Sequence, residues 1–283
     1  MAIGGLYALV AIGYSLVFGI LNFVNFAHGD IYMLGAYAVL ILGTLGLPLV
    51  AALPLAALAC ALLGAGLYLL FYRPLASRAR LTLLIAAVAV SLLLQNGAQL
   101  LFGAEAQAAV FALPDDIWVF ETWGDLVVRV MDVWIVGVAL LLALVTWLLV
   151  RCSRLGLAIR AVASNPRAAA MVGVPVARVV AFTFALSAAL ATVAGALQSM
   201  ATNQVMPLMG LGAGLKAFVA AVLGGMGSLW GAVLGGFALG LLDGLLVGLG
   251  AARWKDVVAY GLLILLLLVR PQGLLGRARW VKV

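Results

Sequence analysis

The sequence predicts an all-α integral membrane protein, a polytopic bundle of about eight or nine transmembrane helices in one domain over residues 1–283. Composition is the first indication, because hydrophobic residues make up 67% of the chain and charged residues only 9%. Soluble globular domains do not have this balance. Spacing is the second indication, since a membrane-spanning helix needs about 20 consecutive apolar residues and long stretches of this chain carry no charge.

The uncharged stretches set the number of expected helices. They lie at residues 1–29, 31–72, 81–104, 133–150, 179–215, 217–242 and 257–269. A single helix over residues 31–72 would be far longer than a bilayer is thick, so we expect two spans joined near Leu47 and Pro48. The last stretch is short, and it spans only if Trp254 and Arg270 reach the two interfaces.

Glycine is abundant, with 33 residues, and several recur at intervals of four toward the C-terminal end. Small residues at this spacing let helices approach closely in lipid. Glycine also permits broken or re-entrant segments of the kind that line cavities in transporters, and the sequence leaves both roles open. The glycines expected to pack helices are Gly227, Gly231, Gly235, Gly236, Gly240 and Gly244.

Charged residues divide the loops into two kinds. Basic residues gather in residues 73–80, in residues 151–178 and after residue 269, whereas residues 104–132 hold six acidic residues and one arginine. Because Lys and Arg of short loops stay on the cytoplasmic side, we expect the basic segments and the C-terminus to be cytoplasmic and the acidic loop to be external. The side of the N-terminus stays open: three full spans before Arg73 put it outside, and one re-entrant segment would put it inside.

The composition also excludes several classes of function. The net charge of +7 is explained by loop position, so we expect no nucleic-acid partner. Cys60 and Cys152 are placed too differently to suggest a disulfide, and His28 is the only histidine, so no metal site is predicted. The G-x-x-x-x-G-K-[ST] phosphate loop and the G-x-S-x-G elbow are missing from the sequence. We therefore expect no catalysis and no cofactor bound by this chain.

Polar residues within the apolar stretches are candidates for a substrate pathway, because polar groups in hydrocarbon are costly without a partner. Asn25 and His28 stand between the first two spans, where the alternative is an interfacial turn with Asp30 as helix N-cap; the sequence favours neither. Amide side chains within a span commonly bond neighbouring helices, and a buried acid usually faces a cavity or a partner. The candidate pathway residues are Asn25, His28, Gln95, Asn96 and Asp243.

Residues 151–178 combine five arginines with the signals of a short helix. Ser164 or Asn165 can cap the helix, and Pro166 fits its first turn. Gly173 suits the position just after its end. Such a helix is too short to be stable alone, so we expect a docking partner or the flanking helices to hold it. A solvated, positively charged loop is the other interpretation.

Several short motifs occur in a fixed order along nearly the whole chain. They include Gly13-Tyr14-Ser15-Leu16-Val17-Phe18-Gly19, Asn25-Phe26-Ala27-His28-Gly29-Asp30, Tyr72-Arg73-Pro74-Leu75, Gly214-Leu215-Lys216-Ala217-Phe218, Lys255-Asp256 and Arg270-Pro271-Gln272-Gly273. With these motifs the chain resembles the permeases of branched-chain amino acid ABC transporters of the LivH type. The resemblance implies a high-affinity importer of leucine, isoleucine and valine in a bacterial inner membrane.

The resemblance also implies partners. They are a second, related permease of the LivM type, two cytoplasmic ATP-binding subunits that carry ATP and Mg, and a soluble periplasmic substrate-binding protein. It further implies that residues 151–178 contain the coupling helix that docks on an ATPase, which fits a short helix in need of a partner. The residues assigned to coupling are Arg154, Gly156, Arg160, Ala161, Asn165, Pro166, Arg167 and Gly173.

Other functions fit the same residues. Permeases for urea, short amides or other amino acids look alike over these motifs, and a structural subunit of a membrane complex with no pathway of its own would share the apolar composition. An intramembrane enzyme would need a nucleophile and a base that the sequence does not offer. We therefore expect a permease that performs no chemistry and leaves ATP hydrolysis to its partners.

Overall fold

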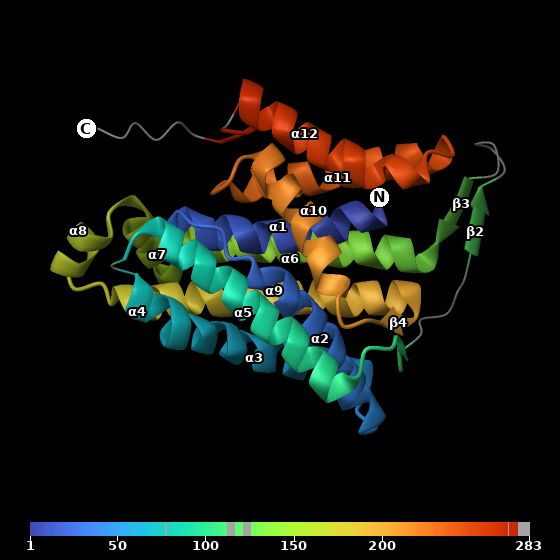
Figure 1. Ribbon diagram of the computed structural model, residues 1–283, viewed down its shortest axis with the longest axis horizontal. Helices are drawn as coiled ribbons and strands as arrows, with labels where there is room; N and C mark the ends of the chain where they lie inside the picture. The colour runs from blue at the N-terminus through green and yellow to red at the C-terminus, as the bar shows by residue number, and fades with distance from the viewer. Residues whose placement is uncertain (77, 112–116, 121–125, 271, 277–283) are drawn as a thin grey trace.

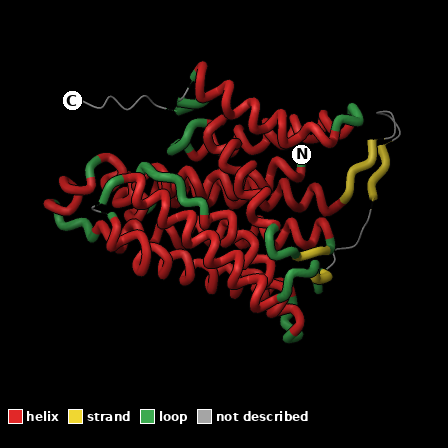
Figure 2. The backbone as a smooth tube through the Cα atoms, in the orientation of Figure 1, coloured by secondary structure: helices red, strands yellow, loops and turns green. Residues whose placement is uncertain are grey.

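The computed structural model describes residues 1–76, 78–111, 117–120, 126–270 and 272–276. The long helices are α1 (Ala2–Leu21), α2 (Ala27–Thr44), α3 (Leu49–Leu67), α5 (Arg80–Phe102), α6 (Val130–Cys152), α9 (Val176–Thr202), α10 (Met209–Gly224), α11 (Leu229–Gly248) and α12 (Lys255–Val269). Figure 1 and Figure 2 show a bundle of helices in which α1, α6 and α9 run along the longest axis of the molecule and α10 crosses it. The short segments are a π-helix (Tyr68–Tyr72), α4 (Arg73–Leu75), α7 (Arg154–Ser164), α8 (Pro166–Met171) and a 3-10 turn (Ala252–Trp254). The helical membrane class predicted from the sequence is confirmed.

Short strands lie outside the helices, at one end of the bundle (Figure 1). Two antiparallel pairs are formed, β1 (Gln107–Ala108) with β4 (Gln204–Val205) and β2 (Ile117–Phe120) with β3 (Leu126–Arg129). Three of these strands fall in the segment expected to be an acidic loop. Four of its acidic residues lie outside the described residues: Asp115, Asp116, Glu121 and Asp125.

Six helical stretches of the described residues are long and apolar enough to cross a membrane. They are Ala2–Leu21, Leu49–Leu75, Leu81–Phe102, Val130–Cys152, Val176–Thr202 and Leu229–Gly248. The expected eight or nine spans are not confirmed. Helix α2 opens with His28 and Asp30, which lower the apolar character of its 18 residues. Helices α10 and α12 have 16 and 15 residues, fewer than the roughly 20 needed for a full crossing.

Several helices end at residues whose backbone conformation is not helical. The uncharged stretch 31–72 forms two helices as predicted, with the break between α2 and α3 at Leu45–Pro48. Helix α1 ends at Asn22 and helix α9 at Asn203, which have φ values of +53° and +54°. Asparagine tolerates this left-handed conformation better than most residues, and it therefore suits a helix C-terminus.

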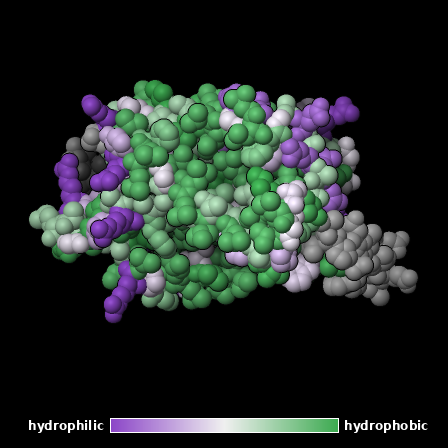
Figure 3. All heavy atoms as spheres, turned by 90° about the horizontal axis from the view of Figure 1, so that it is seen from below, coloured by the Kyte–Doolittle hydropathy of each residue, from purple (hydrophilic) through white to green (hydrophobic). Residues whose placement is uncertain are grey.

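Helix α1 lies at the centre of the bundle. It contacts α6, α9, α10 and α11, and most of its residues are buried. The spanning windows of α3, α5 and α6 are only 22%, 33% and 22% buried, and these outer helices expose many large apolar side chains. Figure 3 shows a broad apolar band on one face, with hydrophilic side chains gathered toward its two ends. A protein that crosses a bilayer has this distribution.

Glycine brings α11 and α1 into direct backbone contact. A Cβ atom on Gly236 would collide with the backbone of Ala8, and one on Gly240 would collide with the backbone of Gly4. The two glycines are four residues apart and therefore lie on one face of α11. Larger residues at these positions would force the two helices apart.

The other expected packing glycines differ in their surroundings. Gly231 and Gly235 lie against the backbone of α10, where a Cβ atom would not fit. Gly227 belongs to the turn between α10 and α11 and has a φ of +90°. Gly244 has open space around its Cα atom. The four-residue repeat therefore includes positions in helix contact and positions outside it.

The two ends of the bundle carry different segments (Figure 1). The N-terminus lies at the end that carries the strands. Helices α7 and α8, together with the end of α12, lie at the opposite end, which also contains α4 and Arg73. Three helices precede Arg73, so the N-terminus and Arg73 are at opposite ends of the molecule.

Candidate functional site

The start of α2 buries two of the candidate pathway residues. The side-chain oxygen of Asn25 accepts a hydrogen bond of 2.7 Å from the Tyr72 hydroxyl. The His28 ring lies 3.2 Å from the Val10 carbonyl oxygen and 3.2 Å from the Ser187 hydroxyl. Asn25 and His28 are each 2% exposed. These bonds join α2 to α1, α9 and the π-helix, so partners within the chain account for the burial of both residues.

Asp30 joins α2 to α5. The interpretation of Asp30 as a helix N-cap is wrong, because α2 begins at Ala27 and Phe26 occupies the cap position. The Asp30 carboxylate instead accepts hydrogen bonds from the Ser91 hydroxyl and, over 2.9 Å, from the Gln95 amide. All three polar side chains are buried. A carboxylate placed here needs donors from another helix, and α5 supplies them.

Gln95 and its neighbour Asn96 have opposite surroundings. Gln95 bonds a neighbouring helix, whereas Asn96 is exposed and donates a hydrogen bond of 2.7 Å to the Leu92 carbonyl oxygen of its own helix. Consecutive helical residues point about 100° apart, so only one of the two reaches the interior. Sequence reasoning missed Ser91, although its spacing of four residues from Gln95 places both on one face of the helix.

Asp243 belongs to a charged cluster that joins four helices. The Lys216 ammonium lies 3.1 Å from an Asp243 oxygen and 2.8 Å from an Asp256 oxygen. The Tyr7 hydroxyl donates a hydrogen bond of 3.1 Å to Asp243. The side chains of Lys216, Asp243 and Asp256 are 13%, 2% and 68% exposed, so the cluster runs from the interior to the surface. Sequence reasoning singled out Asp243 but did not pair it with Lys216, because the two residues lie on separate helices.

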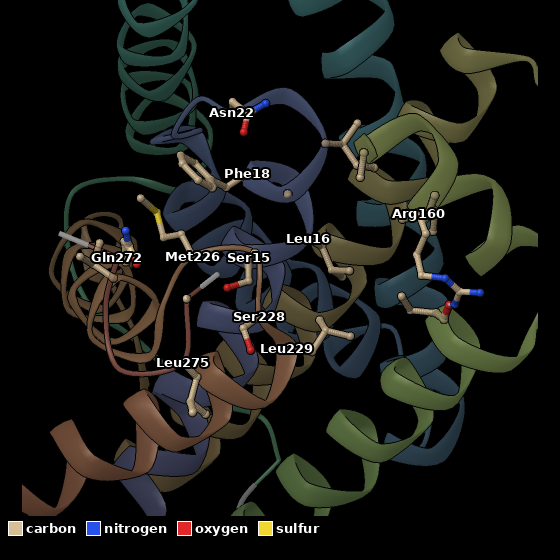
Figure 4. Close-up of a pocket in the computed structure, with 18 residues that line it drawn as sticks. Ser15, Leu16, Phe18, Asn22, Arg160, Met226, Ser228, Leu229, Gln272 and Leu275 are labelled. Atoms are coloured by element: carbon tan, nitrogen blue, oxygen red, sulfur yellow. The ribbon is translucent and has the colours of Figure 1, made fainter. Parts of the chain in front are cut away.

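Two larger cavities open between the described helices, and the second includes Lys216 and Asp256 of the charged cluster. The α7-side cavity has a volume of about 710 Å³ and lies between the end of α1, α7, the α10–α11 turn and residues 272–276. Figure 4 shows Gln272 and Arg160 on opposite sides of it. The Lys216 cavity has a volume of about 320 Å³ and is lined mainly by α1 and α10. None of the five candidate pathway residues lines either of these two cavities.

Helix α7 is fixed to the end of α6. The Ser153 hydroxyl caps α7 by accepting a hydrogen bond of 2.9 Å from the Gly156 N–H. A Cβ atom on Gly156 would collide with the Val150 carbonyl oxygen. The Arg160 guanidinium donates to the carbonyl oxygens of Val150 and Arg151, which the end of a helix leaves without intrahelical partners. These contacts hold the start of α7 against the end of α6.

Helix α8 forms as its sequence signals predict. The Asn165 side chain caps it by accepting hydrogen bonds of 3.0 and 3.1 Å from the N–H groups of Arg167 and Ala168. Pro166 occupies its first turn. Gly173 follows its end with a φ of +86°. The predicted short helix is confirmed, and its two ends coincide with the predicted cap at Asn165 and with Gly173.

Helix α8 projects from the bundle at the end opposite the strands (Figure 1). Ala169 is its one buried residue. Met171 and Val172 are 87% and 79% exposed and give the segment an apolar tip. The other coupling candidates differ in position: Arg154 and Arg167 are exposed, whereas Ala161 of α7 packs partly buried against the core.

Comparison with known proteins identifies the family of this chain. Residues 1–267 match the profile of a family described as the permease component of branched-chain amino acid transport systems. The chain belongs to that family. It is 40% identical to the high-affinity branched-chain amino acid permease BraD of Pseudomonas aeruginosa and 40% identical to LivH of Escherichia coli, and each match covers 100% of this chain and 95% of the relative.

A more distant match extends over part of the chain. The ribose import permease RbsC of Escherichia coli is 31% identical over 47% of this chain and 43% of its own length. No solved structure matches the chain. All three relatives are transport permeases rather than enzymes, and this permease is likewise not an enzyme.

Asp30→Ala should destabilise the protein. The substitution removes the acceptor of the buried Ser91 hydroxyl and leaves the Gln95 amide only its 3.1 Å bond to the Ser91 oxygen. A buried group without a partner costs about 1–3 kcal/mol. The measurement is the unfolding temperature of the purified permease in detergent. Asn96→Leu is the matched control, because Asn96 is exposed on the same helix, and it should unfold as the wild type does. Equal unfolding temperatures for Asp30→Ala and wild type would contradict the assigned role of the carboxylate.

Proposed function

We propose that this chain is the membrane-spanning permease subunit of an ABC importer that carries leucine, isoleucine and valine across a bacterial inner membrane. The observation that carries the proposal is the full-length similarity to two high-affinity branched-chain amino acid permeases. Two cytoplasmic ATPase subunits bind ATP and Mg²⁺, and a soluble periplasmic binding protein delivers the substrate. The permease itself contributes the membrane passage and the contact with the ATPases.

A second, related permease completes the passage in this proposal. Helix α5 exposes Leu92, Asn96 and Leu100, which lie four residues apart and share one face. An amide that faces lipid is unfavourable, so this face suits a protein partner or a water-filled pathway better than hydrocarbon. Its apolar residues fit the side chains of branched amino acids, and Asn96 offers a polar group to their charged end.

The charged residues support an orientation of the chain. The end with α4, α7 and α8 carries exposed arginines, among them Arg73, Arg154 and Arg167, and basic segments stay in the cytoplasm. The end with the strands is then external, and so is the N-terminus. The C-terminus is cytoplasmic, because α12 ends on the same side as α7 and α8 (Figure 1).

Helices α7 and α8 couple the permease to the ATPases. The apolar tip of α8 at Met171 and Val172 inserts into the ATPase surface, and closure of the ATPases displaces the segment. Because Gly156 and Arg160 fix α7 to the end of α6, the displacement moves α6 relative to α1. The α7-side cavity separates α7 from the α10–α11 turn and leaves room for this movement. The passage then opens alternately to the two sides.

Transport of labelled leucine tests the function. In liposomes that contain this chain, the second permease, both ATPases and the binding protein, leucine should accumulate only with ATP. Unlabelled isoleucine and valine should compete because they share its charged groups and apolar branching. Liposomes assembled without this chain should be inactive. Stronger competition by urea, short amides or polar amino acids would contradict the substrate assignment, and uptake in the absence of the chain would contradict the transport role.

Cys152 reports the side of the membrane on which α7 lies. It is exposed at the end of α6, whereas Cys60 is only 4% exposed, so a membrane-impermeant thiol reagent should modify Cys152 alone. We expect no labelling in intact cells and full labelling in inside-out vesicles, with Cys152→Ser as the control that abolishes the signal. Labelling of intact cells would place the α7 end outside and overturn the proposed orientation.

Met171→Glu should weaken assembly with the ATPases. A carboxylate in an apolar contact is costly to desolvate, so we expect the amount of ATPase that copurifies with the tagged permease to fall about tenfold or more. Leu249→Glu is the control, because Leu249 is 80% exposed but follows α11 at the opposite end of the bundle (Figure 1). Unchanged copurification with Met171→Glu would show that the tip of α8 is not the docking surface.

A further inference from the structure

The Lys216 cavity combines apolar walls with groups of both charges. Leu6, Val10 and Met209 are among its apolar lining residues, and Lys216 and Asp256 bring an ammonium and a carboxylate to the same space. Its volume of about 320 Å³ falls at the lower end of the range for small-molecule sites, roughly 300–1,000 Å³. The cavity therefore has the size and the mixed chemistry of a site for a small amphiphilic molecule.

The charged groups at the cavity have unused hydrogen-bonding capacity. A lysine ammonium has three N–H donors, and the bonds to Asp243 and Asp256 use two of them. Asp256 meets Lys216 through Oδ1, and no bond to its second oxygen is formed within the described part of the chain. One donor and one charged acceptor thus remain for a ligand.

Two further polar side chains line the cavity without a hydrogen bond of their own. They are the Tyr32 hydroxyl and the Gln198 amide, and neither is bonded to any residue that the structure describes. Tyr32 is 2% exposed. A buried hydroxyl without a partner is unfavourable, so its place at the wall of a cavity indicates a polar group that occupies this space.

The cavity is closed at one side and open at the other. Val10 and Tyr32 are 1% and 2% exposed, whereas Ile3 is 42% exposed. The Asp256 side chain is 68% exposed, and Gly212 is exposed as well. Asp256 and Gly212 therefore stand at the exposed side of the cavity, and Val10 and Tyr32 stand at its buried side.

We propose that the Lys216 cavity binds the substrate itself, a zwitterionic α-amino acid with an apolar side chain, during its passage through this permease. The free N–H of Lys216, the Tyr32 hydroxyl and the Gln198 amide bind the α-carboxylate. The second oxygen of Asp256 accepts from the α-ammonium. The apolar side chain packs against Leu6, Val10 and Met209. This inference rests on the proposed function, since it assigns a site to the substrate of the importer.

Gly212→Leu fills the cavity and provides the first test. Gly212 has open space around its Cα atom, so the larger side chain enters the cavity without a backbone collision. The probe is L-leucine, and its binding is measured by saturation-transfer NMR on the complex of both permeases and ATPases in nanodiscs, without binding protein. The variant should lose the leucine signal. Gly244→Leu is the matched control, because Gly244 is also an exposed helical glycine in open space and lies outside the cavity.

Tyr32→Phe tests the carboxylate contact without removing any bond within the protein. Loss of one hydrogen bond to the ligand should weaken leucine binding about fivefold. Tyr37→Phe is the matched control: Tyr37 is a buried tyrosine of the same helix whose hydroxyl has no partner among the described residues, and it does not line the cavity. Its leucine affinity should equal that of the wild type.

Two analogues of leucine separate a zwitterion site from a simple ion site. Leucine without its carboxylate is 3-methylbutylamine, and leucine without its ammonium is 4-methylpentanoate. Both should bind at least tenfold more weakly than leucine, because each lacks one of the two charged contacts. Binding of the amine as tight as that of leucine would show a cation site and overturn the proposal.

The outcomes for the site and for the function are distinguishable. If the wild-type complex imports no leucine, the proposed function fails. If it imports leucine but gives no leucine signal in nanodiscs, or if Gly212→Leu and Tyr32→Phe both bind leucine as the wild type does, the site fails and the function stands. Loss of binding in both variants together with normal binding in both controls supports the site.

Discussion

Direct contact between helix backbones is the constraint on which the rest of this bundle depends. Water does not drive helices together inside a bilayer, so close van der Waals contact must hold them. A Cβ atom on Gly236 would collide with Ala8, and a Cβ atom on Gly195 would collide with the Tyr32 carbonyl oxygen. Contacts of this kind allow α1 to be surrounded on most sides by α6, α9, α10 and α11. Glycine thus brings the backbones of α1 and α11 into contact at the centre of the bundle.

Hydrogen bonds and an ion pair hold the helices that make no close glycine contact. Helix α5 contacts chiefly α2, and there the Asp30 carboxylate binds Ser91 and Gln95. Helix α12 contacts α10 and α11, and the Lys216–Asp256 ion pair joins it to α10. In the low-dielectric interior the bonds of Asp30 are directional and costly to leave unmade, whereas the Lys216–Asp256 pair is partly exposed. Small residues therefore fix the core of the bundle, and a few polar groups fix the register of the helices around it.

Local signals were predictable from the sequence, and pairings between distant helices were not. The cap at Asn165, the turn before α3 and the apolar class follow from neighbouring residues. Gly236 and Gly240 touch α1, whereas Gly244, at the same four-residue spacing, has open space around its Cα atom. In the same way, no local pattern distinguishes the inward Gln95 from the outward Asn96. These outcomes depend on how each helix is rotated and on which helix lies opposite.

Helix α10 links the packing to transport. On one side its backbone touches Gly29 of α2 through Gly210 and Gly214. Tilting α10 would break this close packing. On the other side it lines the Lys216 cavity. The bond from Lys216 to the buried Asp243 is costly to break, whereas exposed ion pairs such as that with Asp256 contribute about 1 kcal/mol or less. A movement of the start of α12 away from α10 therefore breaks only the weaker ion pair, and it costs less than a movement of α10 itself. Such a movement widens the cavity and leaves the glycine contacts of α10 intact.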